Sequence, residues 1–351
     1  MRNKVILFCI TTFVLISSTM CFWIPGRKTQ TALADNVNAN AKGECVVEMH
    51  SRRILYARDA DVKLPMASTT KILTAITVLE NCSNLQEKVE IPAEAVGIEG
   101  SSVYLKTSDD YTVEDLLYGL MLRSGNDCAV ALALHCANSL PLFLQKMNHT
   151  AQKAGALQSS FQNPHGLHAE KHYTTARDLS YITCYALKNE TFCQIVSTKC
   201  YEKTGWRNKN KMLKLYEGSI GVKTGYTRNA GKCLVSAAKR EGMTLVCTLL
   251  NCPNTYERTI SLLNDAYKAY TYEPIIEPGQ VLKIQVNGKE EIGLVKDSFS
   301  YPLLQEEKEW LTIKTYAIRN AISSSKNEKI IGKFEIYLAK DLLFSGNLYK
   351  L

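Results

Sequence analysis

The segment LPMASTTKILTA, residues 64–75, places a serine and a lysine three residues apart at the start of a predicted helix. Ser68 falls at the N-cap or in the first turn, and Lys71 follows one turn later on the same face. A serine hydroxyl attacks well only when a base takes its proton, and a lysine can be that base if burial or nearby cations lower its pKa. The helix is expected to continue to Cys82, with a buried stripe made of Ile72, Leu73, Ile76, Val78 and Leu79.

One Ser-x-x-Lys match is weak evidence, because about one or two arise by chance in a chain of this length. A second match, Ser323 with Lys326, lies in a polar stretch near the C-terminus. Ser68 is stronger because Ser124-Gly125-Asn126 follows it, in a break between two helical patterns, with Asp127 able to start the second. The serine hydroxyl there could pass a proton between two amines, and the carboxamide could hold a peptide group.

The tripeptide Lys-Thr-Gly occurs twice, at Lys203-Thr204-Gly205 and at Lys223-Thr224-Gly225. The polar run after the first copy predicts a hairpin turn. The second copy follows the apolar stretch SIGV and precedes two strand patterns, so Lys223 is expected on a strand at a sheet edge. The free backbone groups of an edge strand can pair with an extended ligand. The second copy is therefore the one expected in a cleft with Ser68.

The N-terminus has the parts of a secretory signal. Arg2 and Lys4 precede a mostly apolar run from Val5 to Ile24, and Ala32-Leu33-Ala34 offers a cleavage site. The run is also about long enough to span a bilayer, so an uncleaved segment that associates the protein with the membrane is the alternative. We expect a signal peptide over 1–34 and export to the outer face of the cell membrane or to the cell wall.

The net charge is +8 for the whole chain. Four of the basic residues and none of the acidic ones precede Asp35, so the rest of the chain carries +4. A mild positive excess suits a surface that works among anionic wall polymers, and it gives no basis for a nucleic-acid partner.

Ten cysteines follow the N-terminal segment, and none of them forms a Cys-x-x-Cys pair. Most lie in apolar patterns such as CAVALALHC (128–136) and MTLVCTLLNC (243–252), where a thiol acts as a small buried hydrophobe. A disulfide framework or a zinc site would need closely paired ligands. We therefore expect buried thiols.

The hydrophobic pattern changes near residue 273. Helical and strand patterns alternate before it, whereas period-two patterns dominate after it, as in VLKIQVNGKEEIGLV (281–295), where Asn287-Gly288 is a strong hairpin signal. We predict one catalytic domain over 35–272 and a small β-rich domain over 273–351 that holds no catalytic constellation.

Taken together, the motifs resemble those of penicillin-binding proteins of low molecular mass that act as D-alanyl-D-alanine carboxypeptidases. The resemblance covers most of residues 44–272 and is looser beyond them. It implies the α/β (α+β) fold of penicillin-binding proteins and β-lactamases: an antiparallel sheet flanked by helices, a helical cluster beside it and the cleft between them. The matching stretches are LPMASTTKILTA, LRSGNDCAVALA (122–133), NPHGLHAEKHYTTARDL (163–179) and IGVKTGYTRNAGKCLVSAAKR (220–240).

The resemblance also implies a role for each site residue. Ser68 would be the acylated nucleophile, Lys71 its general base and Ser124 a proton relay. The backbone N–H groups of Ser68 and Tyr226 would form the oxyanion hole, and Lys223 with Thr224 would hold the terminal carboxylate. The implied substrate-binding residues are Asn126, Lys223, Thr224, Gly225 and Tyr226.

The implied reaction removes the last residue of peptidoglycan stem peptides that end in D-Ala-D-Ala, without a metal or organic cofactor. β-Lactam antibiotics would be covalent inhibitors, since they mimic the same peptide. A β-lactamase is one alternative, although we identify no Glu-x-x-x-Asn stretch of the kind that class A enzymes use to position the deacylating water. A wall-peptide-binding protein without turnover is another, and the intact motif residues argue against it.

The matching stretch 163–179 contains three histidines, His165, His168 and His172, which could suggest a metal site. We predict instead a loop that packs under the cleft, with Thr174 or Thr175 capping a helix that begins near Ala176.

Overall fold

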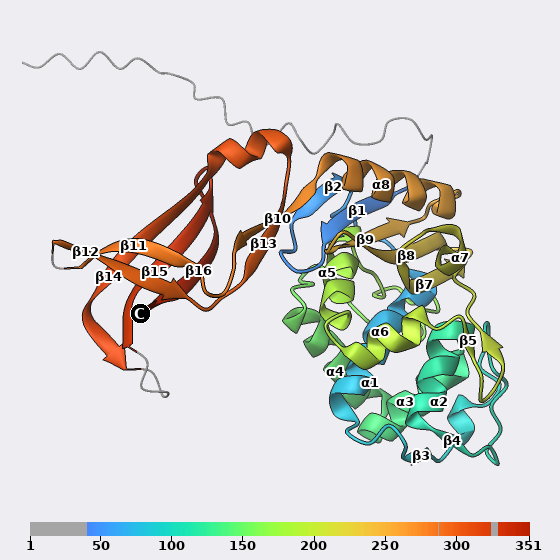
Figure 1. The fold of residues 1–351 in the computed structure, drawn as a ribbon. Coiled ribbons are helices and arrows are strands. Elements are labelled where there is room, and N and C mark those ends of the chain that lie inside the picture. The colour runs from blue at the N-terminus through green and yellow to red at the C-terminus, as the bar shows by residue number, and fades with distance from the viewer. Residues whose placement is uncertain (1–40, 287, 324–328) are drawn as a thin grey trace, which may run out of the picture.

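The computed structural model describes residues 41–286, 288–323 and 329–351. The predicted signal peptide and Lys326 of the second Ser-x-x-Lys match lie outside the described residues. Figure 1 shows a larger domain of helices and strands and a smaller all-β domain, which the strands β10 and β13 connect.

The larger domain is built on a five-stranded antiparallel sheet with the order β2-β1-β9-β8-β7. Because β1 pairs with β9, the start of the domain closes onto its last strand, and β2 and β7 form the two edges. Both faces are covered, so β9 is buried along its whole length and reads as an almost continuous apolar run. The strands are β1 (Gly43–Glu48), β2 (Ile54–Arg58), β7 (Ser219–Thr227), β8 (Gly231–Arg240) and β9 (Met243–Leu250).

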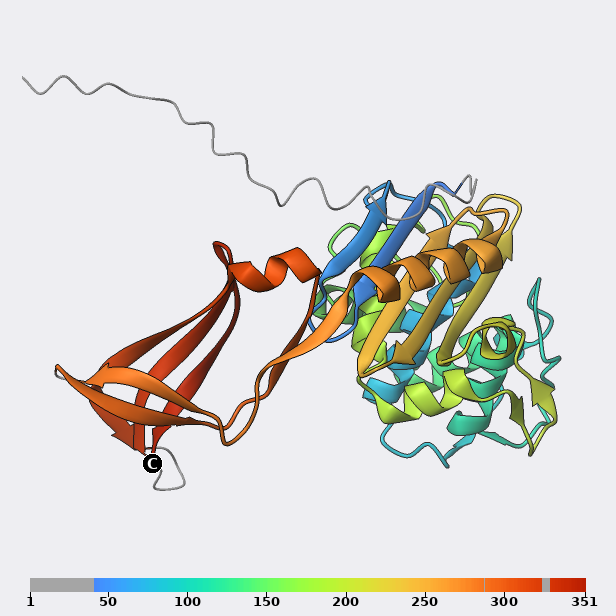
Figure 2. The same cartoon turned by 45° about the horizontal axis from the view of Figure 1, so that its top comes forward.

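Alternate residues of the strands supply two separate cores. Val46 of β1 packs with α8, Thr255–Ala269, which lies along one face of the sheet (Figure 2). Its neighbours Cys45 and Val47 point to the other face, where α1 and α5 pack. This alternation is the period-two pattern of a strand with two different environments.

A helical cluster extends from the second face and contains most of the segment between β2 and β7. The predicted helix over 68–82 is a 3₁₀ turn, Ala67–Thr70, followed directly by α1, Lys71–Asn81. The predicted stripe is buried at Ile72, Leu73, Ile76 and Val78. The other helices are α2 (Val113–Tyr118), α3 (Asn126–Ala137), α4 (Leu140–Lys153), α5 (Ala176–Ala186), α6 (Glu190–Ser197) and α7 (Met212–Leu215).

Two short strand pairs complete the helical cluster. They are β3 (Lys88–Val89) with β4 (Tyr111–Thr112), and β5 (Cys200–Tyr201) with β6 (Trp206–Arg207).

The C-terminal domain contains a second five-stranded antiparallel sheet, with the order β11-β12-β16-β15-β14. Its small core includes Ile284, Val295, Phe334, Ile336 and Leu348. The predicted hairpin is present, because β11 and β12 pair on either side of Asn287-Gly288. The strands are β10 (Thr271–Ile276), β11 (Val281–Val286), β12 (Lys289–Val295), β13 (Phe299–Leu303), β14 (Leu311–Ser323), β15 (Lys329–Leu338) and β16 (Asp341–Lys350).

Arg53, in the turn between β1 and β2, connects the two domains. Its guanidinium donates to both carboxylate oxygens of Glu307 and, at 2.6 Å, to the carbonyl of Pro302. The rings of Tyr270 and Tyr301 each lie 5.2 Å from the guanidinium carbon. This cluster fixes the small domain against the sheet edge that is opposite β7.

The ten cysteines in the described part of the chain are free thiols. Six of them, as predicted for most, are buried: Cys45, Cys128, Cys184, Cys233, Cys247 and Cys252.

Within the described ranges no single helix is long and apolar enough to cross a membrane, and only the bent pair α3 and α4 passes by length and composition.

Candidate active site

Ser68 lies in the 3₁₀ turn that starts α1, and the neighbouring side chains hold this turn. Thr69 Oγ1 donates to the carbonyl of Met66 at 2.6 Å, and Thr70 Oγ1 donates to that of Ala67 at 2.8 Å. Strand β7 packs directly against the turn: a Cβ on Gly225 would lie 3.1 Å from the backbone nitrogen of Ser68. A side chain at the third residue of the Lys-Thr-Gly strand would therefore crowd the turn that carries the nucleophile.

The amine of Lys71 is fully buried beneath Ser68. Its Nζ lies 3.1 Å from Ser68 Oγ and 2.6 Å from both Asn126 Oδ1 and the carbonyl of His165. Burial lowers the pKa of Lys71 well below its usual range, and the nearby Lys223 lowers it further. A lysine with a lowered pKa, in contact with a serine hydroxyl, meets the geometric and electrostatic conditions for a general base.

Ser124 and Asn126 lie at the junction of two helical segments, and the side chain of Asn126 contacts Lys71. The π-helical turn Gly119–Arg123 ends at Ser124, whose φ of 66° is in the left-handed region, and α3 begins at Asn126. A strained backbone at a non-glycine residue is common where function fixes a side chain. Asn126 Nδ2 donates to the carbonyl of Glu99 at 2.6 Å, which orients its Oδ1 toward Lys71.

Asp127 holds the segment 102–105 against the start of α3. Its carboxylate accepts the hydroxyl of Ser102 and the backbone N–H groups of Val103 (3.0 Å) and Leu105 (3.1 Å). The sequence suggested Asp127 only as a helix start, whereas Gly125 is the N-cap of α3. The position of Asp127 directly after Asn126 was the signal that could have identified Asp127 as a residue that supports the site.

Lys223 lies on β7 at the sheet edge, as predicted, and only 2% of its surface is exposed. Burial lowers its pKa to about 7, and Lys209 adds to this shift. Lys209 is a cation that the sequence did not single out, and its Nζ lies 3.4 Å from Ser101 Oγ. It stands in a polar run without any motif, so no local pattern distinguished it.

The other copy of the tripeptide forms the turn between β5 and β6, as predicted. The N–H of Gly205 donates to the carbonyl of Tyr201 at 2.8 Å and closes this hairpin. Lys203 Nζ lies 2.6 Å from the carboxylate of Asp115, a buried residue of α2. Lys203 therefore supports a hairpin and takes no part in the cleft.

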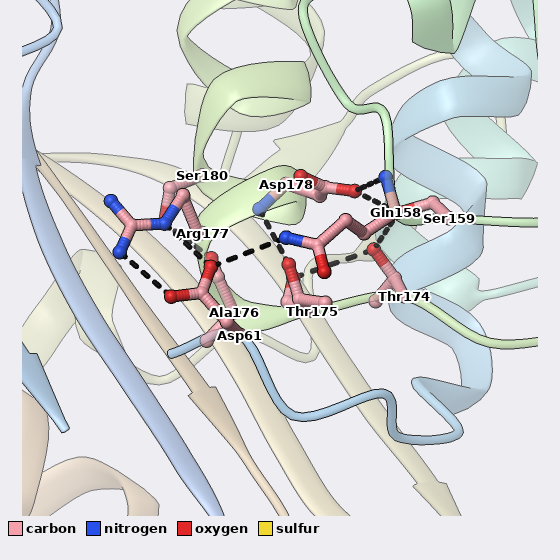
Figure 3. Close-up of polar contacts among 9 residues, drawn as sticks. All are labelled: Asp61, Gln158, Ser159, Thr174, Thr175, Ala176, Arg177, Asp178 and Ser180. Atoms are coloured by element: carbon pink, nitrogen blue, oxygen red, sulfur yellow. Dashed lines mark hydrogen bonds and ion pairs between the residues drawn. The ribbon is translucent and has the colours of Figure 1, made fainter. Parts of the chain in front are cut away.

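The histidine stretch forms a loop below Ser68 and ends at α5, as predicted. Thr175 is the N-cap of this helix, since its Oγ1 accepts the N–H of Asp178 at 3.0 Å (Figure 3). Thr174 Oγ1 contacts Ser159 Oγ instead, and Asp178 accepts from Ser159 and from the N–H of Gln158 at 2.7 Å. These bonds fasten both ends of the loop to one helix start.

The buried imidazoles of the loop favour the neutral form. Burial lowers the pKa of His165 to about 3 and that of His172 to about 4. In the described part of the chain no three His, Cys, Asp or Glu side chains gather in a way that could hold a metal ion.

A family model described as D-alanyl-D-alanine carboxypeptidase matches residues 28–254. The chain belongs to this family. It is a serine peptidase with the fold predicted from its motifs, a mixed α/β domain followed by an all-β domain.

Individual relatives agree with this assignment. The chain is 32% identical over 261 residues to the D-alanyl-D-alanine carboxypeptidase DacF of Bacillus subtilis, and the aligned region covers 70% of this chain and 67% of the relative. It is 40% identical over 219 residues to a D-alanyl-D-alanine carboxypeptidase of Streptomyces, covering 56% of this chain and 75% of that protein.

Two solved structures show which parts of the fold are shared. Penicillin binding protein 5 from Haemophilus influenzae matches with a TM-score of 0.75 and 24% identity, covering 90% of this chain and 98% of that one. The Streptomyces K15 DD-transpeptidase matches with a TM-score of 0.62 and 36% identity, covering 65% of this chain and 97% of that one. The first match therefore extends over both domains.

Contrary to the sequence-based expectation, a Glu-x-x-x-Asn spacing does occur in the chain, at Glu80 and Asn84. Glu80 is in the last turn of α1, where its carboxylate accepts the hydroxyls of Thr150 and Tyr185. Ser68 precedes the first turn of the same helix, so this carboxylate lies at the far end from the nucleophile.

Proposed function

We propose that this enzyme removes the terminal D-alanine of peptidoglycan stem pentapeptides through an acyl-enzyme on Ser68. The contact of Lys71 Nζ with Ser68 Oγ, beside the closely packed backbone of β7 at Gly225, carries this proposal. Family membership supports the substrate class, since the family is described as D-alanyl-D-alanine carboxypeptidase.

Acylation begins when neutral Lys71 takes the proton of Ser68 and the oxygen attacks the carbonyl of the penultimate D-alanine. The backbone N–H groups of Ser68 and Tyr226 stabilise the resulting oxyanion. Ser124 then donates its proton to the nitrogen of the departing residue and takes the proton held by Lys71, which becomes neutral again; the C–N bond breaks, and D-alanine leaves. Water then attacks the ester, Lys71 accepts its proton, and Ser68 is released with its own proton restored.

The terminal carboxylate of the substrate determines which peptide bond is placed at Ser68. It lies one residue beyond the scissile bond, so Lys223 and Thr224 would hold it while Asn126 holds the peptide group. Lys209 would add positive potential there, since it lies close enough to lower the pKa of Lys223. A bound carboxylate favours the charged form of Lys223 and raises its pKa again.

A β-lactam would acylate Ser68 in the same way, because its strained amide and carboxylate occupy the positions of the peptide. Its leaving amine stays tethered, which hinders the approach of water to the ester. We place the enzyme outside the cytoplasm, with residues 1–34 as a signal peptide or membrane-associated segment. The catalytic domain would comprise residues 35–272, and the β-rich domain residues 273–351.

Two substrates test this function. Purified enzyme is mixed separately with diacetyl-Lys-D-Ala-D-Ala and with penicillin, while free D-alanine and intact mass are followed over time. We expect multiple turnovers of the peptide and a penicilloyl adduct on Ser68 that lasts minutes or longer, and Ser68→Ala should abolish both. Rapid penicillin turnover without D-alanine release would favour a β-lactamase, and adduct formation without any turnover would favour a binding protein.

A further inference from the structure

The loop between Ser159 and Thr174 is attached to the helix of the nucleophile at several points. Its carbonyl groups at Pro164 and His165 accept Thr74 Oγ1 and Lys71 Nζ, both at 2.6 Å. A Cβ on Gly166 would lie 1.9 Å from the carbonyl oxygen of Ala67, so the loop backbone touches the turn that carries Ser68. The position of this loop therefore sets the position of one acceptor of the catalytic amine.

That acceptor matters because a neutral amine has two N–H groups and one lone pair. Asn126 Oδ1 and the His165 carbonyl are the two shortest contacts of Lys71 Nζ, and Ser68 Oγ is the third. When the two carbonyl oxygens take both N–H groups, the lone pair is left facing the serine hydroxyl. Movement of the His165 carbonyl would allow the amine to rotate away from Ser68.

His172 is the side chain that connects the loop to the turn of the nucleophile. It is 4% exposed, and its Nδ1 accepts the N–H of Gln162 at 2.9 Å. A neutral imidazole with an acceptor Nδ1 carries its proton on Nε2. That Nε2 lies 2.9 Å from Thr70 Oγ1, whose own hydrogen is directed to the carbonyl of Ala67. The sequence of hydrogen bonds thus runs from Gln162 through His172 and Thr70 to the residue before Ser68.

The surroundings keep this imidazole neutral. The rings of His172 and Phe161 pack in a T-shaped arrangement with centroids 5.8 Å apart, and burial, more than the neighbouring His168 and Lys71, lowers the pKa of His172 to about 4. Protonation would also place a hydrogen on Nδ1 against the N–H of Gln162. The donor and the acceptor of each hydrogen bond from Gln162 through His172 and Thr70 to Ala67 are therefore fixed at the pH where the enzyme works.

We propose that His172 is a positioning residue for the general base: through Thr70 and the loop it holds the His165 carbonyl, and hence Lys71 Nζ, in line with Ser68. This inference rests on the proposed function of Lys71. His172 itself contacts neither substrate nor the reacting atoms. Its loss should therefore reduce the chemical step and leave substrate binding by Lys223 and Thr224 unchanged.

The test compares variants that keep a polar group near one or the other of the two ring nitrogens of His172. His172→Gln places an amide donor near the position of Nε2, whereas His172→Asn keeps a polar group only near Nδ1. The acylation rate with penicillin, counted per enzyme molecule that can be acylated, is measured as a function of pH, together with kcat and KM for the peptide. His168→Ala is the matched control from the same loop, and Thr70→Val against Thr70→Ser tests the next link.

We expect His172→Asn and Thr70→Val to lower the acylation rate and kcat about 10- to 100-fold with KM nearly unchanged. The acidic limb of the pH profile should move to higher pH, because water that enters beside Lys71 makes its charged form less costly. His172→Gln and Thr70→Ser should recover most of the rate, and His168→Ala should stay within about twofold of the original enzyme.

Three results would overturn the proposal: equal effects at His172 and His168, no recovery by glutamine or serine, or a reduced amount of active enzyme with an unchanged rate and pH profile. The last would assign His172 a purely structural role. Because acylation is the readout, normal acylation without D-alanine release would contradict the proposed function and still test the role of His172.

Discussion

Two buried lysines in one cleft must carry opposite charge states for the proposed reaction. Lys71 must be neutral to accept a proton, and its pKa is lowered well below the usual range mainly by burial. Lys223 must be charged to hold a carboxylate, yet its pKa in the unliganded cleft is about 7. Activity therefore depends on pH in two directions: it rises as Lys71 loses its proton and falls as Lys223 loses its own.

These charge states predict different alkaline limits for two kinetic parameters. The ratio kcat/KM reports the free enzyme and should fall above about pH 7, where Lys223 becomes neutral. The parameter kcat reports the complex, in which the substrate carboxylate raises the pKa of Lys223, so kcat should hold to higher pH. Peptide hydrolysis between pH 5 and 10 measures both. Identical alkaline limbs would show that Lys223 does not pair with the carboxylate.

The two Lys-Thr-Gly copies offer a matched pair of substitutions. Lys223→Ala should abolish penicillin acylation and D-alanine release, because either ligand loses the counter-ion of its carboxylate. Lys203→Ala should leave the rate per folded molecule nearly intact and cost about 1 to 3 kcal/mol, since it removes the cation from the buried carboxylate of Asp115, which keeps its bonds to Thr112 and Tyr201. Fluorescent penicillin labelling and urea denaturation separate the two effects. Similar losses of labelling would contradict the assignment of β7.

At the scale of elements, α5 begins where it does because of one threonine. Thr175 Oγ1 satisfies the N–H of Asp178, and Asp178 in turn holds the start of the loop at Gln158 and Ser159 (Figure 3). A helix start that also anchors a loop should be more sensitive than an isolated cap. Ser139, the N-cap of α4, provides the comparison, because its bond to the N–H of Leu142 is exposed and 3.4 Å long.

Thr175→Ala should therefore lower the free energy of unfolding by about 1 to 2 kcal/mol, whereas Ser139→Ala should cost about 0.5 kcal/mol. Thr175→Ser keeps the acceptor oxygen and should retain most of the stability. Urea denaturation of the three variants gives the values. A larger loss at Ser139 than at Thr175 would mean that burial of the cap has no influence here.

Local patterns predicted most of these elements, and tertiary contacts account for what they missed. The spacing of Ser68 and Lys71 and the turn at Lys203 each depend on neighbours within a few residues, so the sequence contains the information. Lys209 lies near Lys223 across α7 and the start of β7, and His172 contacts Thr70, 102 residues before it. No periodicity or cap marks such pairs, and only the folded chain brings them together.

At the scale of the whole molecule, the change to period-two patterns predicted a separate β-rich domain, but not how it attaches. The period-two pattern did not reveal three of the strands. The strands β10 and β13 form a separate two-stranded sheet, and β16 contains the small residues Ser345-Gly346-Asn347, which interrupt its apolar alternation. The attachment depends on Arg53, more than 200 residues before its partner Glu307. Two tyrosines and a carboxylate around one guanidinium form a contact that no local pattern predicts.

The position of this contact leads to a prediction about domain coupling. Arg53 and Glu307 side chains are 13% and 9% exposed, so Arg53→Ala leaves a mostly buried carboxylate without its partner and should cost about 3 kcal/mol or more. The double variant Arg53→Met with Glu307→Leu removes both charges and should recover much of that loss.

Limited proteolysis should cut Arg53→Ala faster near β10, while its penicillin acylation rate stays unchanged. That separation is expected because β2, beside Arg53, and β7, beside Ser68, are opposite edges of one five-stranded sheet. Slower acylation in Arg53→Ala, with the folded fraction taken into account, would instead show that the β-rich domain influences the cleft.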